Sequence, residues 1–151
     1  MKHLLAPLCA ALVVCAAAFV PAIAQDKAAA PRTLKVKLNY TGTGTVDDKH
    51  HIFVFLFDSP GFVRGEGMPI GSQSATSKDA VVTFSDTGKS PVYVATVYDP
   101  TGGYDGQSGP PPAGSSLGMY SKNPGDPAAI DIEAGKSADV QVTFDDTSKM
   151  Q

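Results

Sequence analysis

The chain has 151 residues, of which 42% are hydrophobic and 18% are charged, with a formal net charge of −3. This length suits one domain with a hydrophobic core of its own. The sequence has no basic cluster or stripe, which argues against nucleic acid and anionic membrane surfaces as partners.

The first 24 residues have the pattern of a secretory signal peptide. Lys2 is followed by an apolar run over residues 4–20, and small residues precede the bond between Ala24 and Gln25. We expect a helical signal peptide over 1–24, cleavage between Ala24 and Gln25, and a periplasmic or secreted protein without a transmembrane span after cleavage. The alternative, an uncleaved anchor, would need a longer apolar run and a basic flank.

Both cysteines of the chain, Cys9 and Cys15, lie in this segment, so the mature protein is expected to lack thiols and disulfides. Val14 is too bulky for the position before a lipoprotein cysteine, and lipid anchoring at Cys15 is therefore not expected. Residues 25–32 are rich in alanine and predict a flexible leader. The β domain is expected over 33–147, followed by a tail over 148–151.

The first half of the domain shows the two-residue period of β-strands. Residues 33–40 alternate between apolar and polar side chains, which predicts a half-buried strand. Residues 52–57 are apolar on both faces, which predicts a central strand covered on both sides. Turn residues follow over 58–61. A weak strand over 68–75 and a clearer one over 80–84 come next.

The second half continues this pattern. Strands are expected over 92–98, 130–132 and 140–144, with turn residues at 86–91 and 133–136 between them. About seven short strands result, and no helical period is visible beyond the signal peptide. The sequence therefore predicts an all-β protein, an antiparallel two-sheet sandwich of the immunoglobulin-like or prealbumin-like type.

One segment interrupts the regular spacing of strands. Residues 99–128 contain seven glycines and six prolines, and such a segment cannot form a continuous ladder. A short strand around 117–120 is expected within it. Because a loop of this length in a compact domain is usually functional or disordered, residues 99–128 are the expected location of any site.

Three parts of the sequence resemble known families. Residues 54–62, which read VFLFDSPGF, resemble the second-strand signature of a family of small secreted bacterial proteins of unknown function. Residues 93–99, YVATVYD, match that family's later signature, with Tyr98 where the family has histidine. Gly135, Lys136 and the strand after them resemble the closing strand of that family and of carboxypeptidase-regulatory, transthyretin-like sandwiches. The resemblance implies this β-sandwich fold and implies no activity.

A Gly-rich turn between two aspartates suggests a cation site. Asp99, Thr101 and Asp105 can supply oxygen ligands, which calcium prefers, with Asp47 or Asp48 from a neighbouring loop. The alternative is an Asx-turn that ends the preceding strand. No cofactor other than this calcium ion is expected.

Two further groups of side chains have both a functional and a structural interpretation. His50 and His51 are neighbours on the chain and face opposite sides of a strand, so each could join an aspartate in a metal site or be solvated in a turn. Phe53, Phe55 and Phe57 form an aromatic stripe. This stripe is either a partner surface or a face covered by the long loop.

Aromatic and proline residues of the long loop suggest a binding platform. Tyr98, Tyr104 and Tyr120, together with Pro111 in a proline triplet, could hold a peptide or a sugar at one end of the sandwich. The chain has no tryptophan, which weakens the interpretation as a sugar site. The alternative is a tyrosine-anchored loop folded over the sheet edge.

Motifs of the common hydrolases are missing from the sequence: it has neither a Gly-x-Ser-x-Gly nor a His-Glu-x-x-His motif. We therefore expect an exported, non-catalytic β-sandwich that binds a protein or a cell-envelope glycan through residues 99–128. A structural, calcium-stabilised domain without a dedicated ligand is the first alternative. A hydrolase-like enzyme is the second, because a serine and a histidine can meet in space without a sequence motif.

Overall fold

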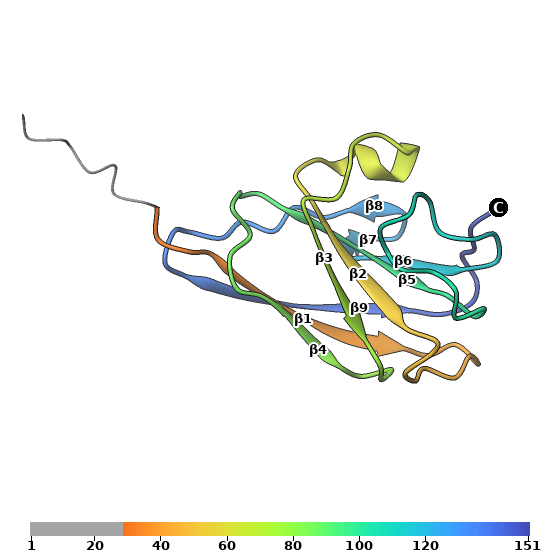
Figure 1. Ribbon diagram of the computed structural model, residues 1–151. Coiled ribbons are helices and arrows are strands. Elements are labelled where there is room, and N and C mark those ends of the chain that lie inside the picture. Colours follow the sequence, from red (N-terminus) through yellow and green to blue (C-terminus); the bar gives the residue numbers. More distant parts are fainter. Residues whose placement is uncertain (1–28) are drawn as a thin grey trace, which may run out of the picture.

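The computed structural model describes residues 29–151, drawn in colour in Figure 1. The expected signal peptide, the cleavage between Ala24 and Gln25, both cysteines and residues 25–28 of the leader lie outside the described residues. Within 29–151, no helix has the length and apolar character needed to cross a bilayer.

The described residues form an all-β structure, as predicted. The elements are β1 (Thr33–Tyr40), β2 (Ile52–Phe57), η1 (Pro60–Arg64, a 3-10 helix), β3 (Gly71–Ala75), β4 (Val81–Phe84), β5 (Tyr93–Tyr98), β6 (Ser116–Met119), β7 (Ser121–Asn123), β8 (Asp126–Pro127) and β9 (Ser137–Phe144). The strands predicted over 33–40 and 52–57 are confirmed at both ends. Those predicted over 68–75, 80–84, 92–98 and 117–120 are shifted or shortened by one to three residues.

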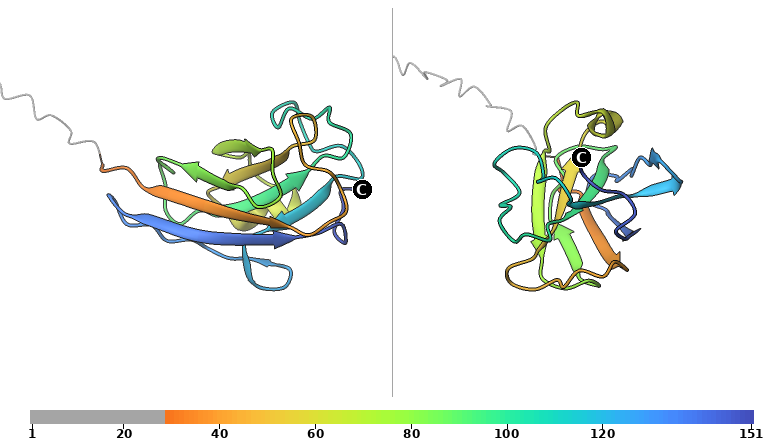
Figure 2. Two further views of the ribbon diagram at one scale, coloured as in Figure 1. Left: turned by 90° about the horizontal axis from the view of Figure 1, so that it is seen from below. Right: turned by 90° about the vertical axis from the view of Figure 1, so that its right-hand side faces the viewer.

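Two sheets face each other across one shared core. One has the strand order β4-β1-β9 and the other β3-β2-β5-β6, while β7 and β8 form a small separate hairpin. Figure 2 shows the long strands β1 and β9 side by side, with strands of the other sheet behind them. This arrangement is consistent with the predicted sandwich.

One pairing differs from the antiparallel expectation: β1 and β9 run parallel, from Thr33 opposite Ser137 to Tyr40 opposite Phe144. The other strand pairs of the two large sheets are antiparallel. A parallel pair requires a long connection between its strands. Almost the whole domain lies between β1 and β9, so no hairpin turn dictates their direction.

The strand β2 is buried on both faces, as its sequence predicts. Ile52, Val54 and Leu56 point into the shared core between the sheets. Phe53 and Phe55 are also buried, in a second cluster on the opposite face. The rings of Phe53 and Phe55 on the outer face of β2 are therefore covered by other parts of the chain.

Three segments differ from the sequence-based expectation. Residues 130–132 form only a single bridge, between Val92 and Ile130, because the amide of Ile132 donates to the side chain of Ser90 instead of a neighbouring strand. The expected loop over 99–128 contains β6, β7 and β8, which leaves 99–115 without strands. In the expected tail, Ser148 and Met150 exchange backbone hydrogen bonds with residues 114–117.

Truncating a side chain between the sheets should destabilise the domain strongly. Leu38 is fully buried, so Leu38→Ala is expected to lower the free energy of unfolding by about 2–5 kcal/mol. The control is Val81, which is 59% exposed on β4. Val81→Ala should change the free energy of unfolding by less than about 0.5 kcal/mol. Urea unfolding measures both, and equal losses would contradict the assignment of this core.

Candidate functional site

The outer face of the four-stranded sheet carries a groove of about 950 Å³. Its floor is formed by Phe55 of β2, Ala95 and Val97 of β5, and Leu117 and Met119 of β6. Strand alternation places these side chains on the face that points away from the shared core. The floor of the groove is therefore apolar.

The first wall of the groove is the segment 62–71, which starts in η1 and leads to β3. Ser59 caps η1 by accepting the amide of Gly61, and Gly65 ends it with a φ of 74°. The ring of Phe62 stacks on Phe57 with centroids 4.6 Å apart. This contact holds the wall against the end of β2.

Three large apolar side chains of this wall remain in contact with water. Met68 is 78% exposed, Val63 47% and Ile70 40%. All three line the groove. Apolar side chains gathered at a concave surface indicate a binding site more strongly than single ones scattered over a surface.

The second wall comes from the Gly- and Pro-rich loop, which lies beside the C terminus in Figure 1. Tyr104 packs on Phe53 at a centroid distance of 5.1 Å in an edge-to-face arrangement, and its hydroxyl donates to the carbonyl of Gly109. Gly106 lies directly on the Phe53 ring, where a Cβ would approach within 2.6 Å. The aromatic stripe is thus partly covered by the long loop, as one of its two interpretations predicted.

The carboxylate of Asp99 organises the start of this loop. Oδ1 accepts the amide and hydroxyl of Thr101, and Oδ2 accepts the amides of Gly103 and Tyr104, all within 2.9 Å. Asp99 is only 1% exposed. Burial acts to raise the pKa of this carboxyl, but the four hydrogen bonds outweigh it and hold the pKa below its usual value.

Asp105 has a similar role further along the loop. Its carboxylate accepts the amides of Gln107 and Ser108 and the hydroxyl of Ser108. These hydrogen bonds lower the pKa of Asp105 to about 2. Both aspartates of the expected calcium site therefore bind donors of their own loop, which is the geometry of the Asx-turn alternative.

Other expected metal ligands are likewise engaged locally. Nδ1 of His50 lies 2.9 Å from Asp47, and Nε2 of His51 lies 3.0 Å from the carbonyl of Asp48. Within residues 29–151, no three or more His, Cys, Asp or Glu side chains are grouped so that they could hold a metal ion. The calcium site with Asp99, Thr101 and Asp105 stays a prediction that this geometry does not support.

The expected platform of three tyrosines is not assembled. Tyr98 points into the shared core, where its ring lies 4.8 Å from that of Tyr40 and its hydroxyl donates to the carbonyl of Thr45. Tyr120 also packs against that core. Only Tyr104 and Pro111 of the four expected ligand-binding residues line the groove. Tyr98 differs because the alternation of β5 turns it inward.

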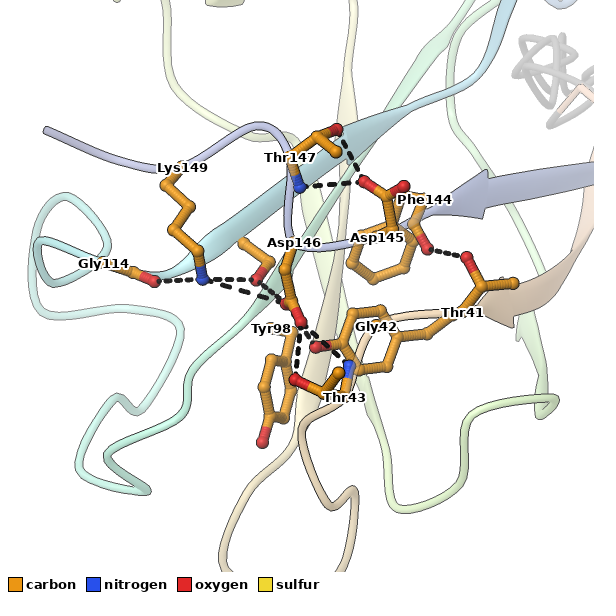
Figure 3. Close-up of polar contacts among 12 residues, drawn as sticks. Thr41, Gly42, Thr43, Tyr98, Gly114, Phe144, Asp145, Asp146, Thr147 and Lys149 are labelled. Atoms are coloured by element: carbon orange, nitrogen blue, oxygen red, sulfur yellow. Dashed lines mark hydrogen bonds and ion pairs between the residues drawn. The ribbon is translucent and has the colours of Figure 1, made fainter.

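A second carboxylate network, shown in Figure 3, fixes the end of the domain next to the groove. Asp146 accepts hydrogen bonds from the hydroxyls of Tyr40 and Ser116, both at 2.6 Å, and from the amide and hydroxyl of Thr43. Lys149 lies 3.8 Å away. Hydrogen bonds from Ser116, Tyr40 and Thr43 hold the pKa of Asp146 well below its usual value. Burial and the Asp146 bond raise the pKa of Tyr40 to about 12.

This network connects both sheets to the C-terminal segment that reaches the groove. Asp146 lies two residues after the end of β9, Tyr40 belongs to β1 and Ser116 belongs to β6. Beyond it, the amide of Met150 donates to the carbonyl of Ser115, and Met150 lines the groove. The hydroxyl of Ser116 is buried and donates to Asp146, so it is not available to a ligand. The Asp146 network therefore has a structural role: it holds these chain segments together.

No protein-family model, curated protein or solved structure matches this chain. The resemblance to carboxypeptidase-regulatory, transthyretin-like sandwiches therefore remains an expectation.

Sequence reasoning missed two parts of the site. The sequence predicts a strand over part of the wall 62–71. The apolar run of Met68, Pro69 and Ile70 next to turn residues is a signal that could have indicated the wall. Asp146 gave no such signal. Its partners Tyr40, Thr43 and Ser116 are 106, 103 and 30 residues away in the chain.

A methyl group at Gly106 should displace the second wall. Gly65 provides a matched control because its φ of 74° is close to the 73° of Gly106 and nothing lies within 4 Å of its Cβ position. Gly65→Ala should cost about 1–2 kcal/mol for the left-handed backbone. Gly106→Ala should cost about 1–3 kcal/mol more, because its Cβ meets the Phe53 ring. Equal losses in thermal unfolding would show that this contact does not hold the loop.

Removing the charge of Asp146 should destabilise the domain at neutral pH. Asp146→Asn keeps the shape but presents an amide donor in place of one acceptor oxygen, and we expect the free energy of unfolding at pH 7 to fall by about 2 kcal/mol. Its neighbour Asp145 accepts hydrogen bonds from the amide and hydroxyl of Thr147, a residue of the same turn, so Asp145→Asn should have a smaller effect.

The pH dependence of this difference is the second readout. The folded-state pKa of Asp146 lies below its ordinary value of 3.8, so its stabilisation is complete above about pH 4 and disappears as the pH falls through the folded-state pKa. Denaturant melts between pH 7 and pH 2 should show wild type and Asp146→Asn converging at the acid end. A constant gap across that range would contradict the role of the charge.

Proposed function

We propose that this protein is an exported, non-catalytic binding module whose groove holds an uncharged, apolar peptide segment of a partner protein. The proposal rests on one observation: among the groove-lining residues that the structure describes, not one is Asp, Glu, Lys, Arg or His. A charged ligand would leave water without gaining a partner there, whereas the side chains of a neutral apolar segment lose little on leaving water.

The polarity of the lining favours a peptide over the glycan that the sequence left open. The polar side chains of the groove are Ser72, Thr96, Tyr104 and Gln107. Of these, Thr96 points between the sheets and the Tyr104 hydroxyl is bonded within its own loop. A sugar needs many directed hydrogen bonds, which two remaining side chains do not supply.

Exposed backbone favours a peptide over a lipid chain. Gly65, Gly67, Gly71, Gly106 and Gly109 all line the groove. The Gly65 amide and the Gly109 carbonyl are bonded within the protein and Gly71 lies in the ladder of β3, whereas the missing side chains of Gly67 and Gly106 leave space for a ligand to approach the backbone. The amides and carbonyls of a bound peptide need hydrogen-bond partners, which backbone groups of the groove can supply. A lipid chain has no hydrogen-bonding groups and would leave those backbone groups without partners.

Within this proposal, the domain is an immunoglobulin-like or prealbumin-like sandwich that carries its site on the outer face of one sheet. The signal peptide pattern supports export to the periplasm or the medium. The segment 104–111 of the long loop supplies one wall of the site, in line with the expectation that residues 99–128 carry the function.

An array of capped decapeptides that vary in apolar content and net charge tests the proposal. We expect labelled protein to bind neutral apolar peptides and to ignore charged ones. Ile70→Asp, which places a carboxylate on the first wall, should weaken this binding about tenfold or more. Val81→Asp is the matched control because it changes an exposed apolar side chain of β4 in the other sheet, outside the groove.

Three outcomes would overturn the proposal: binding that does not depend on the neutral apolar content of the peptides, binding that Ile70→Asp leaves unchanged, or equal losses in Ile70→Asp and Val81→Asp. Binding to phosphatidylcholine vesicles in place of the peptides would assign the groove to a lipid.

A further inference from the structure

We propose that the groove is a methionine oxidation site, at which hydrogen peroxide or another hydroperoxide converts its methionines to sulfoxides and thereby weakens ligand binding. This inference rests on the proposed function, because it describes how binding in that groove is regulated.

The placement of the methionines is the first argument. The chain has four, and Met1 lies outside the described residues. The other three come from separate segments, with Met68 before β3, Met119 at the end of β6 and Met150 near the C terminus. All three line the same groove.

Accessibility is the second argument. Met68 is 78% exposed at the first wall, while Met119 and Met150 are half-buried. The described residues contain no cysteine that would react with the oxidant first. Because oxidation of a thioether follows its exposure, Met68 is expected to react first and the two others more slowly.

The chemistry requires only the oxidant. A lone pair of the methionine sulfur attacks one oxygen of hydrogen peroxide, the O–O bond breaks, the sulfur gains that oxygen, and the other oxygen leaves as water after proton transfer. Sulfur is oxidised by two electrons and the peroxide is reduced by two. Methionine sulfoxide reductases reverse the change, with one enzyme for each sulfoxide epimer.

Methionine sulfoxide makes the lining of the groove more polar. Met119 lies opposite Ala95 in the register of β5 and β6, beside Leu117 and Val97. A sulfoxide is a strong hydrogen-bond acceptor, and an apolar side chain of the ligand seated on it would remove it from water without a donor. Met150 and Met68, which also line the groove, would bring the same penalty.

The experiment compares wild type with the variant Met68→Leu/Met119→Leu/Met150→Leu. Leucine is apolar and close to methionine in volume, so the variant keeps an apolar groove, and the binding of each protein after peroxide is compared with its own binding before treatment. Both proteins are treated with hydrogen peroxide, sulfoxides are located by peptide mass mapping, and binding is measured with Nile red and with the best neutral peptide of the array. Peroxide should weaken binding by wild type about tenfold and leave the variant unchanged. Treatment with both sulfoxide reductases should restore the wild type.

The possible failures are distinguishable. If untreated wild type binds neither probe, the proposed function is wrong and this inference falls with it. If untreated wild type binds and its fully oxidised form binds equally well, only the oxidation site is overturned. A loss of binding in the peroxide-treated triple variant would also overturn it, because the effect would then come from other residues.

Discussion

The strand β2 carries apolar side chains on both faces, and each face has to be removed from water. The sheet β4-β1-β9 covers the inner face and closes the main core. On the outer face no second sheet is present in the described part of the chain, so Phe53 and Phe55 are covered by the loop around Tyr104 and Gly106, while Phe57 is covered by Phe62 of η1. Between these two covers lies the groove, with side chains of β5 and β6 in its floor.

Irregular segments can form the walls of a groove only if something other than a strand ladder holds them. Here carboxylates have that role, since Asp99 and Asp105 bind amides of the long loop and Asp146 joins the ends of β1, β6 and β9. Each carboxylate satisfies several donors at once, which a loop rich in glycine and proline cannot do with its backbone alone. Aspartates that suggest a metal site in the sequence therefore shape the site in the structure.

The composition of the groove connects binding with oxidation. A lining without charge selects neutral ligands, and methionine is an apolar residue flexible enough to adapt to ligands of different shape. The same thioether is the group that an oxidant converts into a polar one. Methionine supplies the only sulfur atoms of residues 29–151, so no thiol of this domain competes with it for an oxidant.

The sequence by itself determined the β class, the bounds of β1 and β2 and the burial of both faces of β2. These properties depend on side-chain alternation and turn residues, which act over a few neighbouring positions. Only the tertiary structure decided the parallel pairing of β1 with β9, the inward position of Tyr98, the wall over 62–71 and the partners of Asp146. Each of these depends on which segments meet across the core, and a local period of two residues does not encode the choice among distant partners.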